Sequence, residues 1–281
     1  MTLRVRLQRW YLGLHGLALL REWPFGDPAT AEARMDAMRR LLEGEGDDKV
    51  FEERVIDDLD PANAYREWSA TYDDPNPLIV AEQGALRALL SELPAGRALD
   101  VATGTGRIAD ELERLGHRVI SVDLSESMLS VGRSERGSIQ TVVGDFTRLP
   151  FAEVSADVIV CGLALTHVDD LTPVFDGFGR IVAPGGAVVT SDIHPMATST
   201  GGHAFFKRSD GTRGVTRNHI HWPSAYVSAA IAAGLVVRRC VEVFIDEALL
   251  RELGVEDLYL SPEKALEGLP FALLWAFERP A

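Results

Sequence analysis

The sequence is poor in cysteine, in basic residues and in long apolar runs. Its two cysteines, Cys161 and Cys240, lie inside apolar runs typical of strands, so we expect reduced core thiols and no disulfide framework. The 28 basic residues are outnumbered by 42 acidic ones, which leaves a net charge of −14. Because nucleic-acid binding draws on clustered Lys and Arg, this balance argues against a nucleic-acid partner.

Membrane and secretion signals are also weak. No stretch reaches the roughly 18 apolar residues that a membrane-spanning helix needs. Arg4, Arg6 and Arg9 precede the apolar run 10–20, as in a signal peptide, but Arg21 and not a small-residue cleavage site follows. We therefore expect a cytoplasmic protein without a membrane partner.

Residues 1–76 are predicted to form a helical N-terminal cap and lid. Apolar residues recur at helical spacing in the first helix, and Asp27-Pro28 opens a second helix that Gly44 closes. Tyr65, Trp68 and Tyr72 then share one helical face, a pattern typical of a core; their place just before the next unit favours a lid. The apolar helices also make a homo-oligomer one expectation.

A glycine turn follows at 98–109, ALDVATGTGRIA. The apolar run 98–102 predicts a buried strand, and a helix is expected from Arg107 to about Leu115. Glycine permits close approach of backbone to ligand, so Gly104 and Gly106 are expected to line a cofactor beneath a helix N-terminus. The same residues fit a dinucleotide fingerprint, so the turn alone leaves the cofactor open.

Strands and helices alternate from 97 to 192, which predicts a parallel α/β sheet. Strands are expected at 97–102, 118–123, 139–144, 157–161 and 187–192, with later strands at 235–244 and 271–277. Crossovers place the carboxyl ends of parallel strands on one edge, where Asp100, Asp123 and Asp145 would meet. Carboxylates repel a pyrophosphate and attract a cofactor that bears a sulfonium and an ammonium.

These motifs carry a family resemblance. LDVATGTGRIA at 99–109, VISVDLSESML at 119–129, VVGDFTRLPF at 142–151, ADVIVCGLALTHVDD at 156–170 and GRIVAPGGAVVTSDIHP at 179–195 occur in order. Together they resemble the class I S-adenosylmethionine-dependent methyltransferases, in particular the small-molecule group that includes quinone-biosynthesis enzymes. The resemblance implies a Rossmann-like, seven-stranded, mostly parallel sheet in a domain at 77–281, with a substrate-lid insertion at 193–222.

The resemblance also implies site residues for S-adenosylmethionine, the product being S-adenosylhomocysteine. The methionine part would lie by the glycine turn, the ribose on Asp123, the adenine by Asp145 and its neighbours, and the lid over the methyl group. The implied cofactor residues are Tyr65, Tyr72, Asp100, Ala102, Gly104, Gly106, Asp123, Leu124, Met128, Gly144, Asp145, Phe146, Cys161, Leu163 and Thr166. The family often has glycine where this chain has Ala102.

Histidines are the candidates for the proton step, because their pKa lies close to neutrality. We rank His194 and His221 slightly ahead of His167. The insertion holds Lys207, Arg208, Arg213 and Arg217 against one acid, Asp210; Arg213, Arg217 and His219 are therefore candidate contacts to an anionic small-molecule acceptor. A metal held by His203, His219 and His221 has no supporting Cys or carboxylate pattern, so we expect none.

The expected function is methyl transfer from S-adenosylmethionine to a small molecule, most readily at oxygen with a histidine base. Carbon or nitrogen methylation, or a non-methylating cyclisation on the same fold, are the alternatives within this cofactor class. The alternative that the protein is an NAD-linked oxidoreductase is supported by the dinucleotide fingerprint alone. A non-catalytic assembly partner would use residues 1–50 to join other subunits.

Overall fold

The computed structural model describes residues 1–137, 140–252 and 261–281. Contacts within the chain group it into two compact units, Met1–Asp58 with Phe244–Leu269 and Leu59–Val243 with Pro270–Ala281. Residues 59–76, expected with the N-terminal cap, group with the second unit, whereas 244–269, expected with the sheet domain, group with the first. Where the chain is described, no helix is both long and apolar enough to cross a membrane.

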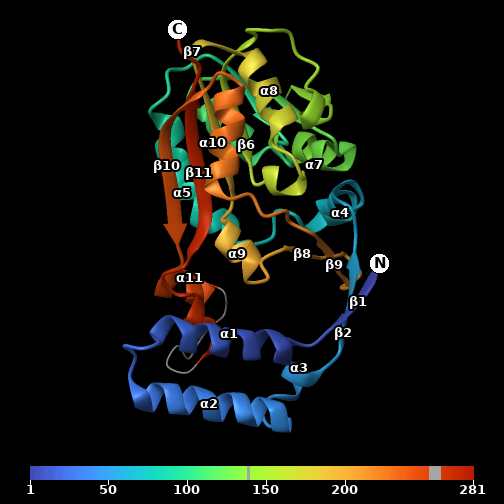
Figure 1. Ribbon diagram of the computed structural model, residues 1–281. Coiled ribbons are helices and arrows are strands. Elements are labelled where there is room, and N and C mark those ends of the chain that lie inside the picture. The colour runs from blue at the N-terminus through green and yellow to red at the C-terminus, as the bar shows by residue number, and fades with distance from the viewer. Residues whose placement is uncertain (138–139, 253–260) are drawn as a thin grey trace. The chain divides into compact units, whose positions relative to one another are not determined.

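The first unit combines three N-terminal helices with a strand pair (Figure 1). Its helices are α1 (Leu7–Glu22), α2 (Pro28–Glu43), α3 (Asp48–Phe51), α11 (Glu247–Glu252) and the short 3-10 helix η4 (Pro262–Leu266). As expected, Asp27 caps α2 and Gly44 ends it in a left-handed conformation. Leu14 and Ala18 of α1 pack with Ala265 in a small core.

This unit is less purely helical than the sequence suggests. Strands β1 (Thr2–Val5) and β2 (Arg54–Asp58) pair antiparallel, with Thr2 opposite Asp57. Each strand is only four or five residues long, and pairing joins positions some 55 residues apart. A local pattern does not reveal such a long-range pairing.

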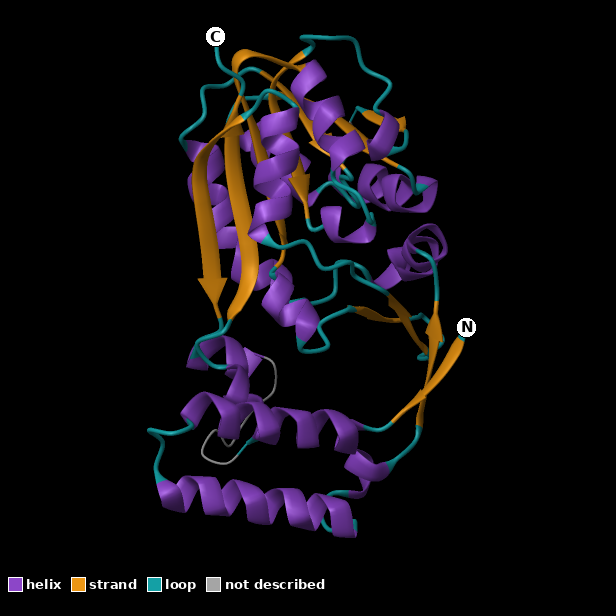
Figure 2. Ribbon diagram, in the orientation of Figure 1, coloured by secondary structure: helices purple, strands orange, loops and turns teal. Residues whose placement is uncertain are grey.

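The second unit is built on the expected seven-stranded sheet, whose strands Figure 2 shows in orange. Its order is β10-β11-β7-β6-β3-β4-β5. The strands are β3 (Arg97–Val101), β4 (Arg118–Asp123), β5 (Thr141–Val143), β6 (Ala156–Gly162), β7 (Val182–Ile193), β10 (Val236–Phe244) and β11 (Pro270–Glu278). Strands β3 to β7 pair in parallel and β11 pairs antiparallel to β7. Ile139, where the third strand was expected to begin, lies outside the described residues.

Helices cover both faces of this sheet (Figure 1). On one face α8 (Thr172–Ile181) and α10 (Pro223–Ala232) pack in the core that contains Cys161 and Trp275. On the other, α5 (Pro77–Ser91) and α6 (Arg107–Arg114) pack in a second core. Strand residues alternate between the two cores, as the period of two requires. The α/β class and the mostly parallel sheet are confirmed.

The second unit also contains further helices and a hairpin. They are α4 (Pro61–Trp68), α7 (Glu126–Arg136), α9 (Pro195–Ser199), the hairpin β8 (Ala204–Lys207) and β9 (Arg213–Thr216), and the 3-10 helices η1 (Ser69–Thr71), η2 (Phe146–Arg148) and η3 (Leu165–His167). The insertion at 193–222 thus forms α9 and a β-hairpin.

One core expectation is wrong. Cys161 is buried, but Cys240 is exposed. Cys240 lies on β10, which is the edge strand of the sheet. An edge strand has a neighbour on one side only, so an apolar run there does not ensure burial.

Candidate functional site

The glycine turn follows β3 and leads into α6, as predicted. Gly104 and Gly106 have φ of 58° and 91°, in the left-handed region that favours glycine. A Cβ on Gly104 would lie 3.6 Å from Cε1 of Tyr72, so a side chain there would begin to fill the space between the turn and the Tyr72 ring. Gly104 and Tyr72 both line the same pocket.

Asp123 ends β4 beside this turn. Its Oδ2 accepts from the Gly104 amide at 2.8 Å, and its Oδ1 accepts from the Ser125 amide at 2.8 Å. Burial raises the pKa of Asp123, and the backbone donors offset part of that effect. Each oxygen keeps a lone pair that can accept from a ribose hydroxyl, so the turn and Asp123 fit an adenosyl group.

Tyr65 and His167 form the polar pair of the pocket. The Tyr65 hydroxyl lies 2.7 Å from Nε2 of His167, although the two residues are 102 positions apart. Burial lowers the pKa of His167 to about 4, and a backbone contact from Arg217 offsets only part of this effect. Burial also raises the pKa of Tyr65 well above its usual value. At neutral pH both groups are therefore uncharged.

The aromatic lid is held by the insertion. Trp68 stacks on Phe206 of β8 with ring centroids 5.3 Å apart, and on its other side it stacks on Tyr65 at 5.5 Å. The Thr71 hydroxyl donates to the carbonyl of Lys207 at 2.6 Å. Trp68 is buried in a core, as the stripe predicts, and Tyr65 and Tyr72 line the pocket; that the stripe acts as a lid stays a prediction.

The turn, Asp123 and the lid enclose one pocket. Nine of the predicted residues line it: Tyr65, Tyr72, Ala102, Gly104, Asp123, Leu124, Phe146, Leu163 and His167. Five lining residues were missed: Pro61, Ala62, Ser125, Gly162 and Ala164. Ser125, Gly162 and Ala164 adjoin predicted positions, and Ser125 is also the N-cap of α7. Pro61 and Ala62 lie four and three residues before Tyr65 on α4, so helical spacing could have found these two.

The two histidines ranked first lie elsewhere. His194 caps α9 by accepting from the Met196 amide at 3.1 Å, and its Nε2 lies 3.0 Å from Glu242 of β10. His221 is buried, with its Nε2 2.7 Å from the carbonyl oxygen of Val168. Neither lines the pocket, whereas His167 does; which histidine acts as the base stays a prediction.

The other predicted cofactor residues are not among those that line the pocket. Asp100 is fully buried under the turn and accepts from the Thr103 hydroxyl; burial raises its pKa to about 7. Asp145 is exposed and caps η2 by accepting from the Thr147 amide. Met128 and Cys161 are core residues. Of the glycines, Gly106 is the N-cap of α6 and Gly144 donates to the Asp123 carbonyl.

The basic insertion residues are not among those that line this pocket. Arg213 and Arg217 are exposed on the insertion. The Thr166 hydroxyl donates to the His219 carbonyl at 3.1 Å, and the His219 amide donates to the Thr166 carbonyl at 2.7 Å. These bonds tie the end of the insertion to the turn that carries His167. In the described ranges, no group of His, Cys, Asp and Glu is arranged to hold a metal ion.

Two lining residues carry backbone strain. Ala102 and Leu163 have φ of 54° and 55°, a conformation that costs a residue with a Cβ about 1–2 kcal/mol. Ala102 directly follows β3 and Leu163 directly follows β6, and these two strands are neighbours in the sheet. Such strain gathers where a surrounding structure must hold a ligand-binding backbone.

Known proteins resemble this chain in sequence and in fold. A methyltransferase domain family matches residues 99–190. The demethylmenaquinone methyltransferase of Staphylococcus saprophyticus is 32% identical over 54% of this chain and 67% of its own length. The malonyl-[acyl-carrier protein] O-methyltransferase of Yersinia pestis is 27% identical over 60% of this chain and 65% of its own. The chain spans about half the length of other curated relatives that it matches, 44% and 59% for two further demethylmenaquinone methyltransferases.

A solved structure agrees with these relatives. The S-adenosylmethionine-dependent methyltransferase from Mesorhizobium loti is 25% identical, with a TM-score of 0.55 over 71% of this chain and 98% of its own. The mostly parallel seven-stranded sheet agrees with that fold. This chain belongs to the class I S-adenosylmethionine-dependent methyltransferase family.

Proposed function

We propose that this protein transfers the methyl group of S-adenosylmethionine to an oxygen of a small-molecule acceptor, with Tyr65 and His167 moving the proton. The observation that carries the proposal is the 2.7 Å contact between these two side chains in the pocket that also contains Gly104 and Asp123. A nucleophile, its proton acceptor and the cofactor cradle must share one space for such a reaction.

The cofactor fits the residues present. Asp123 would hold the ribose hydroxyls, Leu124 and Phe146 would border the adenine, and the turn would hold the methionine part. When bound, S-adenosylmethionine supplies a methyl group on a positively charged sulfur, and the carbon–sulfur bond breaks with its electron pair left on sulfur. The acceptor oxygen forms the new bond to the methyl carbon.

The proton then follows the hydrogen bond already present. The acceptor hydroxyl gives its proton to the Tyr65 oxygen as the Tyr65 proton passes to Nε2 of His167. With a pKa of about 4, protonating His167 at pH 7 costs about 4 kcal/mol. An acidic hydroxyl such as a phenol or enol offsets this cost better than an aliphatic alcohol, so we expect a phenolic or enolic acceptor.

An anionic acceptor and a homo-oligomer are further parts of the proposal. Exposed Arg213 and Arg217, on an insertion tied to the His167 turn, support contacts to a carboxylate or phosphate. Replacing either arginine by glutamine should then weaken the binding of an anionic acceptor more than the binding of a neutral acceptor. Exposed Trp23 and Phe25 in the first unit support self-association, which light scattering after chromatography tests.

The test of the proposed function begins with the cofactor. Calorimetry should show binding of S-adenosylmethionine and S-adenosylhomocysteine and none of NAD; the reverse result would defeat the proposal. Mass spectrometry should then detect a gain of one methyl group on an acceptor, tried first on demethylmenaquinone, on a malonyl thioester of acyl carrier protein and on simple phenols. Product analysis by NMR assigns the methyl to oxygen or to carbon.

A further inference from the structure

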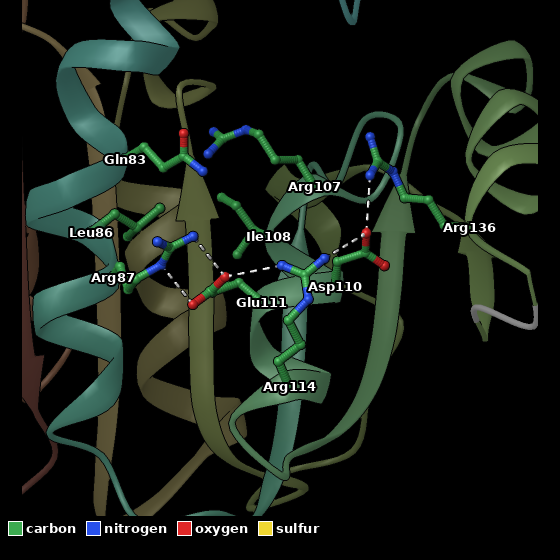
Figure 3. A pocket seen from close by; sticks show the side chains of 9 residues that line it. All are labelled: Gln83, Leu86, Arg87, Arg107, Ile108, Asp110, Glu111, Arg114 and Arg136. Carbon is green, nitrogen blue, oxygen red and sulfur yellow. Dashed lines mark hydrogen bonds and ion pairs between the residues drawn. The ribbon is translucent and has the colours of Figure 1, made fainter.

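Arg136, the last residue of α7, joins three segments around the glycine turn. Its Nε donates to the carbonyl of Thr105 at 2.8 Å, and its Nη1 donates to Oδ2 of Asp110 at 2.9 Å. Its Nη2 lies 3.3 Å from Oδ2 of Asp73. Figure 3 shows the Asp110 contact at the edge of an arginine-lined pocket behind the turn.

The partners of Arg136 also contact each other. The Thr105 hydroxyl donates to Oδ1 of Asp73 at 2.8 Å, so Arg136, Thr105 and Asp73 form a closed set of hydrogen bonds. Thr105 lies between the two glycines of the turn, and Asp73 directly follows the lid residue Tyr72. The set therefore fixes the distance between the turn and the lid on the side away from the ligand.

The packing of α7 explains why this arginine reaches the turn. A Cβ on Gly132 would lie 2.6 Å from the Thr105 carbonyl oxygen, so the helix can approach the turn only with glycine there. At the other end of α7, the Ser125 amide donates to Asp123. Both ends of the helix thus contact groups that form the cofactor cradle.

We propose that Arg136 is a positioning residue for S-adenosylmethionine binding. It favours binding by holding Asp73 and the Thr105 carbonyl at a fixed position relative to each other. It is not among the residues that line the cofactor pocket, so it acts through the turn and the lid. Its side chain is 22% exposed, and partial shielding from water strengthens charge-assisted hydrogen bonds. The inference rests on the cofactor site of the proposed function.

Arg114 provides a matched control within the same pocket. It pairs with Asp110 at 3.7 Å and with Glu111 at 3.2 Å, and its side chain is 66% exposed. Figure 3 shows Arg114 and Arg136 reaching Asp110 from opposite sides. Arg114→Gln removes the same charge from the same pocket and leaves the contacts to Thr105 and Asp73 in place.

The experiment compares Arg136→Gln, Arg136→Lys, Asp73→Asn and Arg114→Gln by calorimetric titration with S-adenosylmethionine and S-adenosylhomocysteine. We expect Arg136→Gln and Asp73→Asn to weaken binding about tenfold or more, because each removes charged hydrogen bonds. Arg136→Lys keeps the charge without the forked geometry and should fall between Gln and wild type. Combining Arg136→Gln with Asp73→Asn should weaken binding less than the product of the two single effects.

Hydrogen exchange of the ligand-free proteins gives a readout that needs no cofactor. Peptides that cover 69–75 and 103–106 should exchange faster in Arg136→Gln than in wild type, and Arg114→Gln should leave them unchanged. Equal exchange and equal affinity in Arg136→Gln and Arg114→Gln would overturn the inference. If the wild type binds no S-adenosylmethionine, the proposed function fails, and the exchange comparison alone decides whether Arg136 holds the lid to the turn.

Discussion

Replacing Tyr65 by Phe tests the proton path most directly. The substitution keeps the ring that stacks on Trp68 at 5.5 Å and removes the hydroxyl that lies 2.7 Å from Nε2 of His167. If Tyr65 merely positions the imidazole, the loss is that of one hydrogen bond to a partly buried group, about 1–2 kcal/mol or roughly five- to thirtyfold in rate. If Tyr65 relays the proton, the loss approaches the whole of general base catalysis, about 10²–10⁴-fold.

The assay measures S-adenosylhomocysteine release at saturating cofactor with the acceptor identified by mass spectrometry. We expect kcat to fall at least about a hundredfold, with calorimetric affinity for S-adenosylmethionine changed by less than about threefold, since the ring remains. Tyr72→Phe is the matched control, because Tyr72 lines the same pocket and its ring packs on Tyr65 and Trp68. A kcat within about thirtyfold of wild type in Tyr65→Phe, the range expected from positioning alone, or an equal loss in Tyr72→Phe, would refute the relay.

Three further predictions follow from the buried groups of the site. Burial lowers the pKa of His167 to about 4, so the base stays unprotonated down to about that pH and kcat/KM should not fall near pH 6.5. A pH–rate profile of the folded enzyme in which kcat/KM falls around pH 6.5 would contradict this prediction. Burial raises the pKa of Asp100 to about 7. Between about pH 4 and pH 7 the folded state therefore keeps a proton on Asp100 that the unfolded state has released. The contribution of this carboxyl group to stability falls as the pH rises through that range. Asp100→Asn should therefore gain stability relative to wild type between pH 5 and pH 8 in urea titrations, and a constant difference would argue against a buried neutral acid. Ala102→Gly should relieve the backbone strain of a φ of 54°, which stabilises the folded state by about 1–2 kcal/mol, whereas the added chain entropy of the unfolded state costs about 0.5–1 kcal/mol. Thermal melts should therefore show an unchanged or slightly raised Tm. A drop of several degrees would show that the methyl group of Ala102 packs favourably.

Much of the fold could be predicted because its signals are local. Five apolar runs at regular spacing gave the parallel strands, and the carboxylates and glycines at their ends marked the edge where the pocket lies. Asp123 illustrates the reason: the end of a strand, the turn beside it and the N-cap of the next helix are all set within a few residues. The class of cofactor was predicted from acidic strand ends and from the family resemblance; of the three carboxylates expected to meet, only Asp123 lines the pocket, because Asp100 is buried under the turn and Asp145 is exposed.

The sequence by itself thus determined the sheet and the glycine turn, and it predicted nine of the residues that line the pocket. Only the tertiary structure decided which histidine enters the pocket, because His167 meets Tyr65 across 102 positions while His194 and His221 bond to Glu242 and to a backbone carbonyl. The same holds for β1 and β2, which pair across some 55 positions. It holds too for Arg136, whose partners Thr105, Asp110 and Asp73 lie 26 to 63 positions away. Spacing along the chain carries periodicity and capping, whereas packing between distant segments decides which polar groups become partners and which remain free to face a ligand.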